Sequence, residues 1–170
     1  MRVTSVLCLM VSMVTVVFAQ QQQPANPPKN PKPAFTLTIS TEQGTVAPGS
    51  KVIVTVRLTN QSDRPLNFPW SGFGGPDPSY RVEVRNGQGQ LAPYTEDYGK
   101  RLRREPPYDH IIGRSVGYTV EKGATATEEI EVTKQYDFST PGKYTIRVFH
   151  PDRDADINVQ SNAITLTVTE

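Results

Sequence analysis

The chain has 170 residues, with 18 basic and 17 acidic side chains, a formal net charge of +1 and a single cysteine, Cys8. This charge balance excludes an overall field that would attract nucleic acid or an anionic membrane. One cysteine excludes a disulfide framework within the chain, so we expect a folded domain to depend on its hydrophobic core.

Residues 1–19 have the pattern of a secretory signal peptide. Arg2 supplies a short positive region, an apolar run follows, and Val17-Phe18-Ala19 ends in small residues before a cleavage site at Gln20. A transmembrane anchor and a lipoprotein are the alternatives, but the run is near the lower limit for a span and Cys8 lies too early for lipidation. Cleavage leaves a secreted or periplasmic chain with no cysteine and no membrane span, and with 17 basic and 17 acidic residues.

Residues 20–34 read QQQQPANPPKNPKPA, and five of these fifteen residues are proline. Such a segment buries too little apolar surface to offset its chain entropy, which predicts a disordered, semi-extended linker. A proline-rich ligand for another domain is the alternative interpretation. The folded domain is therefore expected over residues 35–170.

From residue 35 onward the apolar residues alternate with polar ones, which is typical of antiparallel strands with one buried face. The expected strands are 35–41, 51–59, 80–85, 126–132, 144–150 and 162–169. Turn-forming residues separate them at 47–50, 60–63, 86–89 and 121–123. Because no segment has a clear helical period, the sequence predicts an all-β, immunoglobulin-like antiparallel β-sandwich.

The turn before residue 144 predicts a tyrosine corner. Residues 133–143 are expected to cross from one sheet to the other, with Pro141 fixing φ ahead of Gly142. In such sandwiches a tyrosine at the start of the next strand donates its hydroxyl to the backbone of the crossing. Tyr144 has this position, and a simple core aromatic is the alternative.

Four segments carry a resemblance to known domains: GSKVIVTVRLT (49–59), Asn60-x-Ser62, YDFSTPGKYTI (136–146) and SNAITLTVT (161–169). Together they resemble secreted bacterial Ig-like domains of uncharacterised type. That resemblance implies a sandwich fold and an envelope or extracellular setting, and it implies no catalytic residue. Residues 56–91 also resemble the bacterial intracellular proteinase inhibitor family, another Ig-like sandwich, from which this chain departs by having a signal peptide.

Two stretches are candidate contact surfaces for a protein or a glycan. Residues 69–78, PWSGFGGPDP, place Trp70 and Phe73 on an expected loop, although Trp70 packed on the core is the alternative. Residues 100–104, KRLRR, place Arg101, Arg103 and Arg104 close to Tyr98, a pattern that could contact a phosphate, a glycan sulfate or an acidic partner. Nearby acidic residues offset much of this charge, so a solvated loop is the alternative there.

Asp152, Asp154 and Asp156 alternate in DRDAD and are a candidate Ca²⁺ site, because hard cations take several oxygen ligands. The spacing does not fit an EF-hand, since Ile157 and Ala163 occupy the positions that need glycine and glutamate. A solvated hairpin loop between the last two strands is the alternative. No other cofactor is expected.

Enzyme chemistry has little support in the sequence. His110 and His150 are the two histidines, both expected at the surface, and no metalloprotease or nucleophile-elbow motif is present. Asn60-Gln61-Ser62 fits a glycosylation sequon. We therefore expect a non-catalytic binding or accessory module that uses residues 70–78 and 94–110. An extracytoplasmic proteinase inhibitor is the first alternative and a calcium-stabilised adhesion domain the second.

Overall fold

The computed structural model describes residues 32–71, 79–103 and 115–170. The expected signal peptide and most of the linker therefore lie outside the described residues. The elements in chain order are β1 (Phe35–Ser40), β2 (Thr45–Val46), β3 (Ile53–Asn60), β4 (Leu66–Ser71), β5 (Arg81–Arg85), α1 (Glu96–Arg103), β6 (Ser115–Val120), β7 (Thr125–Glu131), the short 3-10 helix η1 (Val132–Lys134), β8 (Gly142–Asp152), β9 (Ile157–Gln160) and β10 (Ile164–Val168). In these described ranges no helix is long and apolar enough to cross a membrane.

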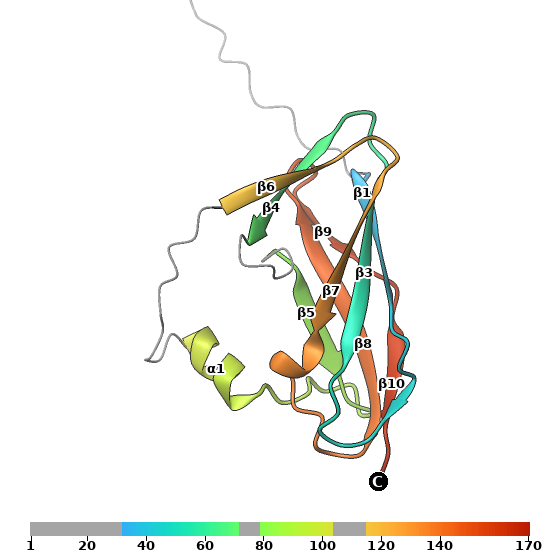
Figure 1. Ribbon diagram of the computed structural model, residues 1–170, viewed down its shortest axis with the longest axis vertical. Helices are drawn as coiled ribbons and strands as arrows, with labels where there is room; N and C mark the ends of the chain where they lie inside the picture. The colour runs from blue at the N-terminus through green and yellow to red at the C-terminus, as the bar shows by residue number, and fades with distance from the viewer. Residues whose placement is uncertain (1–31, 72–78, 104–114) are drawn as a thin grey trace, which may run out of the picture.

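The strands form two facing sheets and one short ladder (Figure 1). The first sheet has the order β1-β3-β7, and the second has the order β2-β10-β8-β5, with β9 beside β8. β4 and β6 pair separately. Among the described strand pairs, β2 and β10 are parallel and all the others are antiparallel. The predicted immunoglobulin-like β-sandwich is confirmed by this arrangement.

The core lies between the two sheets and is built from the apolar positions of the alternating pattern. The first sheet contributes alternate residues of β3, which are fully buried: Val52 (just before the strand), Val54, Val56 and Leu58. The second sheet contributes Val84, Ile146, Val148 and Leu166, which are also fully buried. Burying a side chain of this size stabilises the fold by roughly 1.5–3 kcal/mol, so the inner faces account for most of the favourable free energy.

The predicted turns lie where the composition places them. Ser50 donates its backbone N–H to the carbonyl oxygen of Ala47 across 3.1 Å, and Gly49 has a φ of 73° that glycine adopts without strain. Residues 86–90 reverse the chain after β5, and the Asn86 side chain accepts hydrogen bonds from the N–H groups of Gln88 and Gln90. The side chains of turn residues thus satisfy backbone N–H groups where the hydrogen bonds between strands end.

The crossing between the sheets occurs between β7 and β8. The Tyr144 hydroxyl donates to the carbonyl oxygen of Thr140 across 2.7 Å, four residues upstream. Gly142 opens β8 with a φ of 150°, and the Tyr144 ring packs edge-on against Phe138 at a centroid distance of 5.1 Å. This is the geometry of a tyrosine corner, and it fixes the direction in which β8 enters the second sheet.

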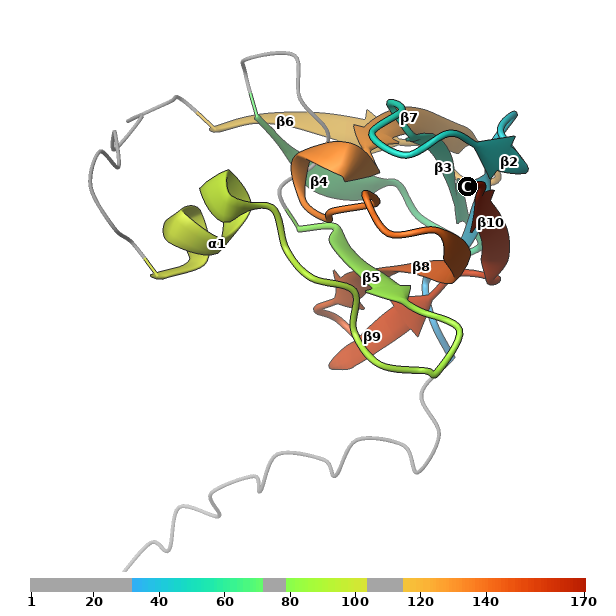
Figure 2. The same ribbon diagram turned by 90° about the horizontal axis from the view of Figure 1, so that it is seen from below.

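Three expectations differ from the structure. Residues 96–103 form a helix, although no helix was expected from the sequence. β4 continues to Ser71, so the backbone of Trp70 is in a strand opposite Val116 rather than in a loop. The last hairpin contains an additional strand, β9, because β8 runs on to Asp152 and pairs with it. The α1 segment lies to one side of the sandwich, away from β2 and β10 (Figure 2).

Candidate functional site

The start of α1 is fixed by Thr95. Its hydroxyl oxygen accepts from the Tyr98 N–H at 3.3 Å, as an N-cap does, and the hydroxyl donates to the Lys134 carbonyl oxygen at 3.0 Å. The Thr95 N–H donates to the Gln135 carbonyl oxygen at 3.0 Å. One residue therefore both begins the helix and attaches it to the chain that follows η1.

The charges along α1 follow the helix dipole. Glu96 and Asp97 lie in the first turn, and Lys100, Arg101 and Arg103 lie towards the end. Glu96 and Lys100 form an ion pair of 2.6 Å four residues apart. Such exposed pairs contribute only about 0.3–0.5 kcal/mol, so an eight-residue helix needs its attachment through Thr95.

Apolar side chains are exposed around this helix. Within the described ranges, the exposed large apolar side chains are Leu91, Tyr94 and Leu102, at 51%, 43% and 53%. Tyr98 is half-buried and tilted against Tyr94, with ring centroids 5.3 Å apart, and Tyr94 in turn packs on Tyr136 at 5.0 Å. Burial raises the pKa of the Tyr98 hydroxyl, so the ring remains a neutral, amphipathic contact group.

We name these groups, which all belong to residues 91–103, the α1 surface, defined by Leu91, Tyr94, Tyr98, Arg101, Leu102 and Arg103. Of the predicted contact residues, Tyr98, Arg101 and Arg103 lie on this one short helix. Arg104 and Phe73 lie outside the described residues, as does the Trp70 side chain, so the predictions for them stay predictions. Leu91 and Leu102 were not singled out from the sequence, although the Thr95 cap and the ordered charges could have indicated a helix presenting them.

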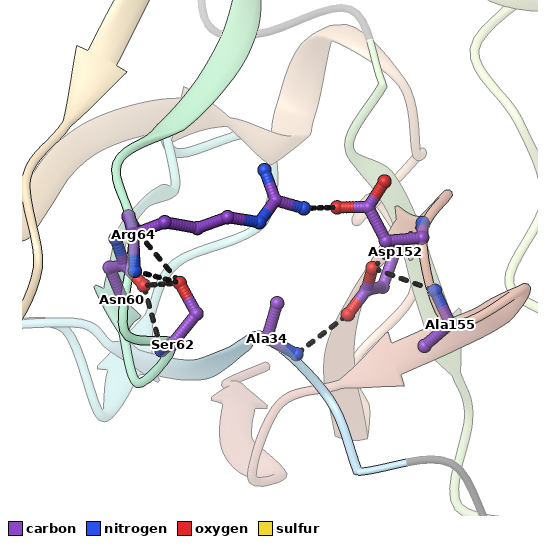
Figure 3. Close-up of polar contacts among 7 residues, drawn as sticks. Ala34, Asn60, Ser62, Arg64, Asp152 and Ala155 are labelled. Atoms are coloured by element: carbon purple, nitrogen blue, oxygen red, sulfur yellow. Dashed lines mark hydrogen bonds and ion pairs between the residues drawn. The ribbon is translucent and has the colours of Figure 1, made fainter.

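The three aspartates of the predicted Ca²⁺ site have separate structural contacts, and Figure 3 shows those of Asp152 with Ala34 and Ala155. Asp152 is 4% exposed, and one carboxylate oxygen accepts from the Ala34 N–H at 2.7 Å. The other oxygen accepts from the N–H groups of Asp154 and Ala155 at 3.1 and 3.2 Å. Asp154 pairs instead with Arg64, and Asp156 has a φ of 53° in the turn.

These contacts satisfy the backbone around Asp152 and leave the carboxylates apart. Among the residues that the structure describes, no group of three or more His, Cys, Asp or Glu side chains is placed to hold a metal ion. Asp152 instead ties the entry to β1 to the turn after β8, a role that the sequence analysis did not predict.

His150 is buried at 3% exposure, so its predicted surface position is wrong. Its ring packs edge-on between Phe35, Phe68 and Tyr80 at centroid distances of 5.4, 5.3 and 5.0 Å. It also borders a cavity of about 230 Å³ that Arg64 and Asp152 help to line. This volume is below the roughly 300 Å³ at which small-molecule sites begin. His110 lies outside the described residues.

The sequon asparagine is part of the core. Asn60 is 1% exposed, and its Nδ2 donates to the carbonyl oxygens of Arg64 and Val120 at 2.8 and 2.9 Å. Its Oδ1 accepts from the N–H and the hydroxyl of Ser62 at 2.9 and 2.7 Å. Because Nδ2 is the atom that a glycan would join, the folded domain offers no glycosylation site here.

Comparison with known proteins assigns this chain to no family. No protein-family model matches the chain, and no curated protein matches it. The CARDB domain of a Pyrococcus furiosus protein, crystallised in complex with di-metal ions, is 12% identical, covers 81% of this chain and 89% of its own, and has a TM-score of 0.42. The solution structure of that domain is 13% identical, with 81% and 95% covered and a TM-score of 0.42.

A human domain is similar in sequence identity and has a lower TM-score. The ASH/PapD-like domain of CEP192 is 13% identical, with 92% of this chain and 97% of that chain covered and a TM-score of 0.33. All three are thus similar to this chain at low identity. Such similarity assigns no activity, metal or partner to this chain.

Proposed function

We propose that this protein is a non-catalytic, exported binding module whose α1 surface contacts a partner protein. The observation that carries the proposal is the position of the exposed large apolar side chains. In the described part of the chain, all of them fall between residues 91 and 102: Leu102 is on α1, and Leu91 and Tyr94 are in the segment that leads into it. Clustered apolar exposure on a soluble domain marks an interaction surface.

The chemistry of the α1 surface indicates which partner fits. Tyr94, Tyr98 and Leu102 supply an apolar and aromatic centre, and such residues dominate the free energy of binding at interfaces. Arg101 and Arg103 flank that centre. A complementary partner therefore has an apolar pocket with an acidic rim, which would also increase the association rate.

Two further observations support the proposal. In the described ranges His150 is the one histidine, and it is buried and packed against aromatic rings, which supports a structural role for it. The signal-peptide pattern of residues 1–19 supports export.

The test is comparative capture from the extracellular and envelope fractions of the producing cells. The full chain is immobilised beside Leu102→Asp, Tyr94→Ser and the control Thr38→Asp. Thr38 is exposed on β1 of the first sheet, so its change adds the same charge away from α1. We expect a partner that the wild type and the control retain and both α1 variants lose. Identical captures by all four proteins would contradict the proposal.

A further inference from the structure

The outer face of the second sheet carries a concentration of positive charge. Side chains alternate along each strand, and Val82, Val84, Ile146 and Val148 point into the core. Their neighbours therefore point outwards. The basic face consists of four cations around one carboxylate: Arg81, Arg85, Lys143, Arg147 and Glu83.

The strand register places these groups beside one another. Glu83 of β5 lies opposite Arg147 of β8, and Arg85 lies opposite Thr145. The Glu83 carboxylate accepts from the Arg85 Nε at 2.8 Å and lies 3.6 Å from the Arg81 guanidinium. One carboxylate among four cations leaves a local net charge of +3, and no ion pair within the described residues neutralises Lys143 or Arg147.

The opposite outer face shows that this concentration is specific to the second sheet. On the first sheet the outward charges are Lys51 and Arg57 against Glu129 and Glu131, a net charge of zero. Lys51 and Glu131 pair there at 3.2 Å. The two faces of one sandwich therefore differ by three charges, although the chain as a whole is nearly neutral.

The remaining groups on the basic face are polar. Thr145, Thr165 and Thr167 point outwards from β8 and β10, because the residues before and after them on each strand pack into or against the core. The apolar exception is Phe149, which is half-buried, and the Arg81 guanidinium covers its ring at 4.1 Å. The face thus combines spaced cations with hydroxyl groups on one side of the second sheet.

We propose that this basic face binds an anionic polysaccharide, one that bears carboxylate or sulfate groups at intervals along an extended chain. Residues two apart on a strand are separated by about 6.6–6.8 Å and neighbouring strands by about 4.8 Å. The cations therefore form a regularly spaced array that matches charges repeated along a polymer. Arginine can bind each carboxylate or sulfate through two parallel hydrogen bonds, and the threonine hydroxyls can pair with sugar hydroxyls.

Other anionic partners fit this face less well. A folded protein needs an apolar centre in its contact, and Arg81 already covers Phe149. Single-stranded nucleic acid needs open aromatic rings for stacking. A membrane surface favours unbroken positive charge with apolar side chains to insert, whereas Glu83 lies in the middle of this face.

The test measures binding of the full chain to immobilised heparin and polygalacturonate, with dextran as the neutral polymer, over a series of salt concentrations. The face variant is Lys143→Glu/Arg147→Glu, and the matched control is Arg101→Glu/Arg103→Glu on α1, which changes the net charge equally. Thr165→Glu is a second face variant at an exposed position. Far-ultraviolet circular dichroism and the melting temperature establish that each variant is folded.

We expect the wild type to bind one of the two anionic polymers and not dextran, with an affinity that falls as salt rises. Both face variants should lower that affinity, the double change by about tenfold, and the control by less than about twofold. Arg147→Lys should keep most of the binding. The control changes α1 and leaves the basic face intact. Loss of polymer binding in the face variants alone therefore tests the basic face separately from the proposed α1 contact.

Three results would overturn the inference. If the wild type binds neither polymer at low salt, the basic face does not bind an anionic polysaccharide. Equal losses in the face and α1 variants show attraction by net charge alone. Tighter binding to polyglutamate, to single-stranded DNA or to phosphatidylserine vesicles than to either polysaccharide assigns the face to another class of partner.

Discussion

The Tyr136 hydroxyl donates a hydrogen bond of 2.9 Å to the carbonyl oxygen of Val82, which lies 54 residues earlier in the chain. Val82 belongs to β5, the last strand of the second sheet. The carbonyl oxygen of Val84, two residues further along the same edge of β5, accepts a hydrogen bond from the Ala92 N–H at 2.9 Å. The edge of the sheet is therefore covered by the chain's own groups, which opposes pairing with another molecule.

Tyr136→Phe should lower the free energy of unfolding by about 1 kcal/mol, because it keeps the ring and removes one buried hydrogen bond. Urea denaturation of the variant and the wild type measures this difference. Tyr94→Phe is the control, since Tyr94 is 43% exposed and its change should cost less. A Tyr136→Phe variant as stable as the wild type would show that the Val82 carbonyl needs no partner.

The same tyrosine should shape stability in alkaline solution. Burial above all, and then the neighbouring Tyr94, raise the pKa of Tyr136 above its ordinary value. The neutral phenol is thus favoured in the folded state, and the unfolded chain ionises first once the pH passes about 10. The free energy of unfolding should fall from about that pH upward, and fall less steeply in Tyr136→Phe. Parallel curves above that pH would contradict the assignment.

Asn60→Ala should lower the free energy of unfolding by about 2–3 kcal/mol. The change leaves the buried carbonyl oxygen of Val120 without its Asn60 donor and removes one of two side-chain donors to the Arg64 carbonyl oxygen, the other being the Ser62 hydroxyl. Thermal and urea denaturation measure the loss, and Gln61→Ala on the neighbouring exposed position is the control. A loss no larger than that of the control would mean that water replaces the amide at this corner.

Asp152→Ala should lower the free energy of unfolding by about 2 kcal/mol, because it removes the acceptor for three backbone N–H groups. Asp154→Ala should cost less than about 1 kcal/mol, since its pair with Arg64 is exposed. The melting temperature of the wild type should be the same in Ca²⁺ and in EDTA. A higher melting temperature in Ca²⁺ would restore the calcium site as a ligand of the folded state.

The alternation of apolar residues predicts the sandwich because one buried face per strand is what two packed sheets require. The same alternation also determines the direction of the polar side chains on these strands. Tyr144, Ile146 and Val148 point inwards, so His150 and Asp152 on the same strand point inwards too. In the same way Asn60 follows Leu58 on the inner face of β3. The polar character of these residues suggested that their side chains are exposed. The two-residue period of the strands instead places them on the buried face.

The helix and the basic face needed more than a local pattern. α1 lacks an apolar stripe and contains Gly99, which costs about 1 kcal/mol in a helix interior, so hydrophobic periodicity does not identify it. Its attachment to η1 through Thr95 brings together residues 39 positions apart. The basic face depends on the order of β5 beside β8, which no local period encodes.

Hydrogen–deuterium exchange of the full chain, alone and with the partner that the wild type retains, tests the proposed function most directly. The account predicts slower exchange on binding in residues 91–103, with β1 and β3 of the first sheet unchanged. Protection confined to other segments, with the exchange of residues 91–103 unaltered, would contradict the proposal that α1 is the contact surface.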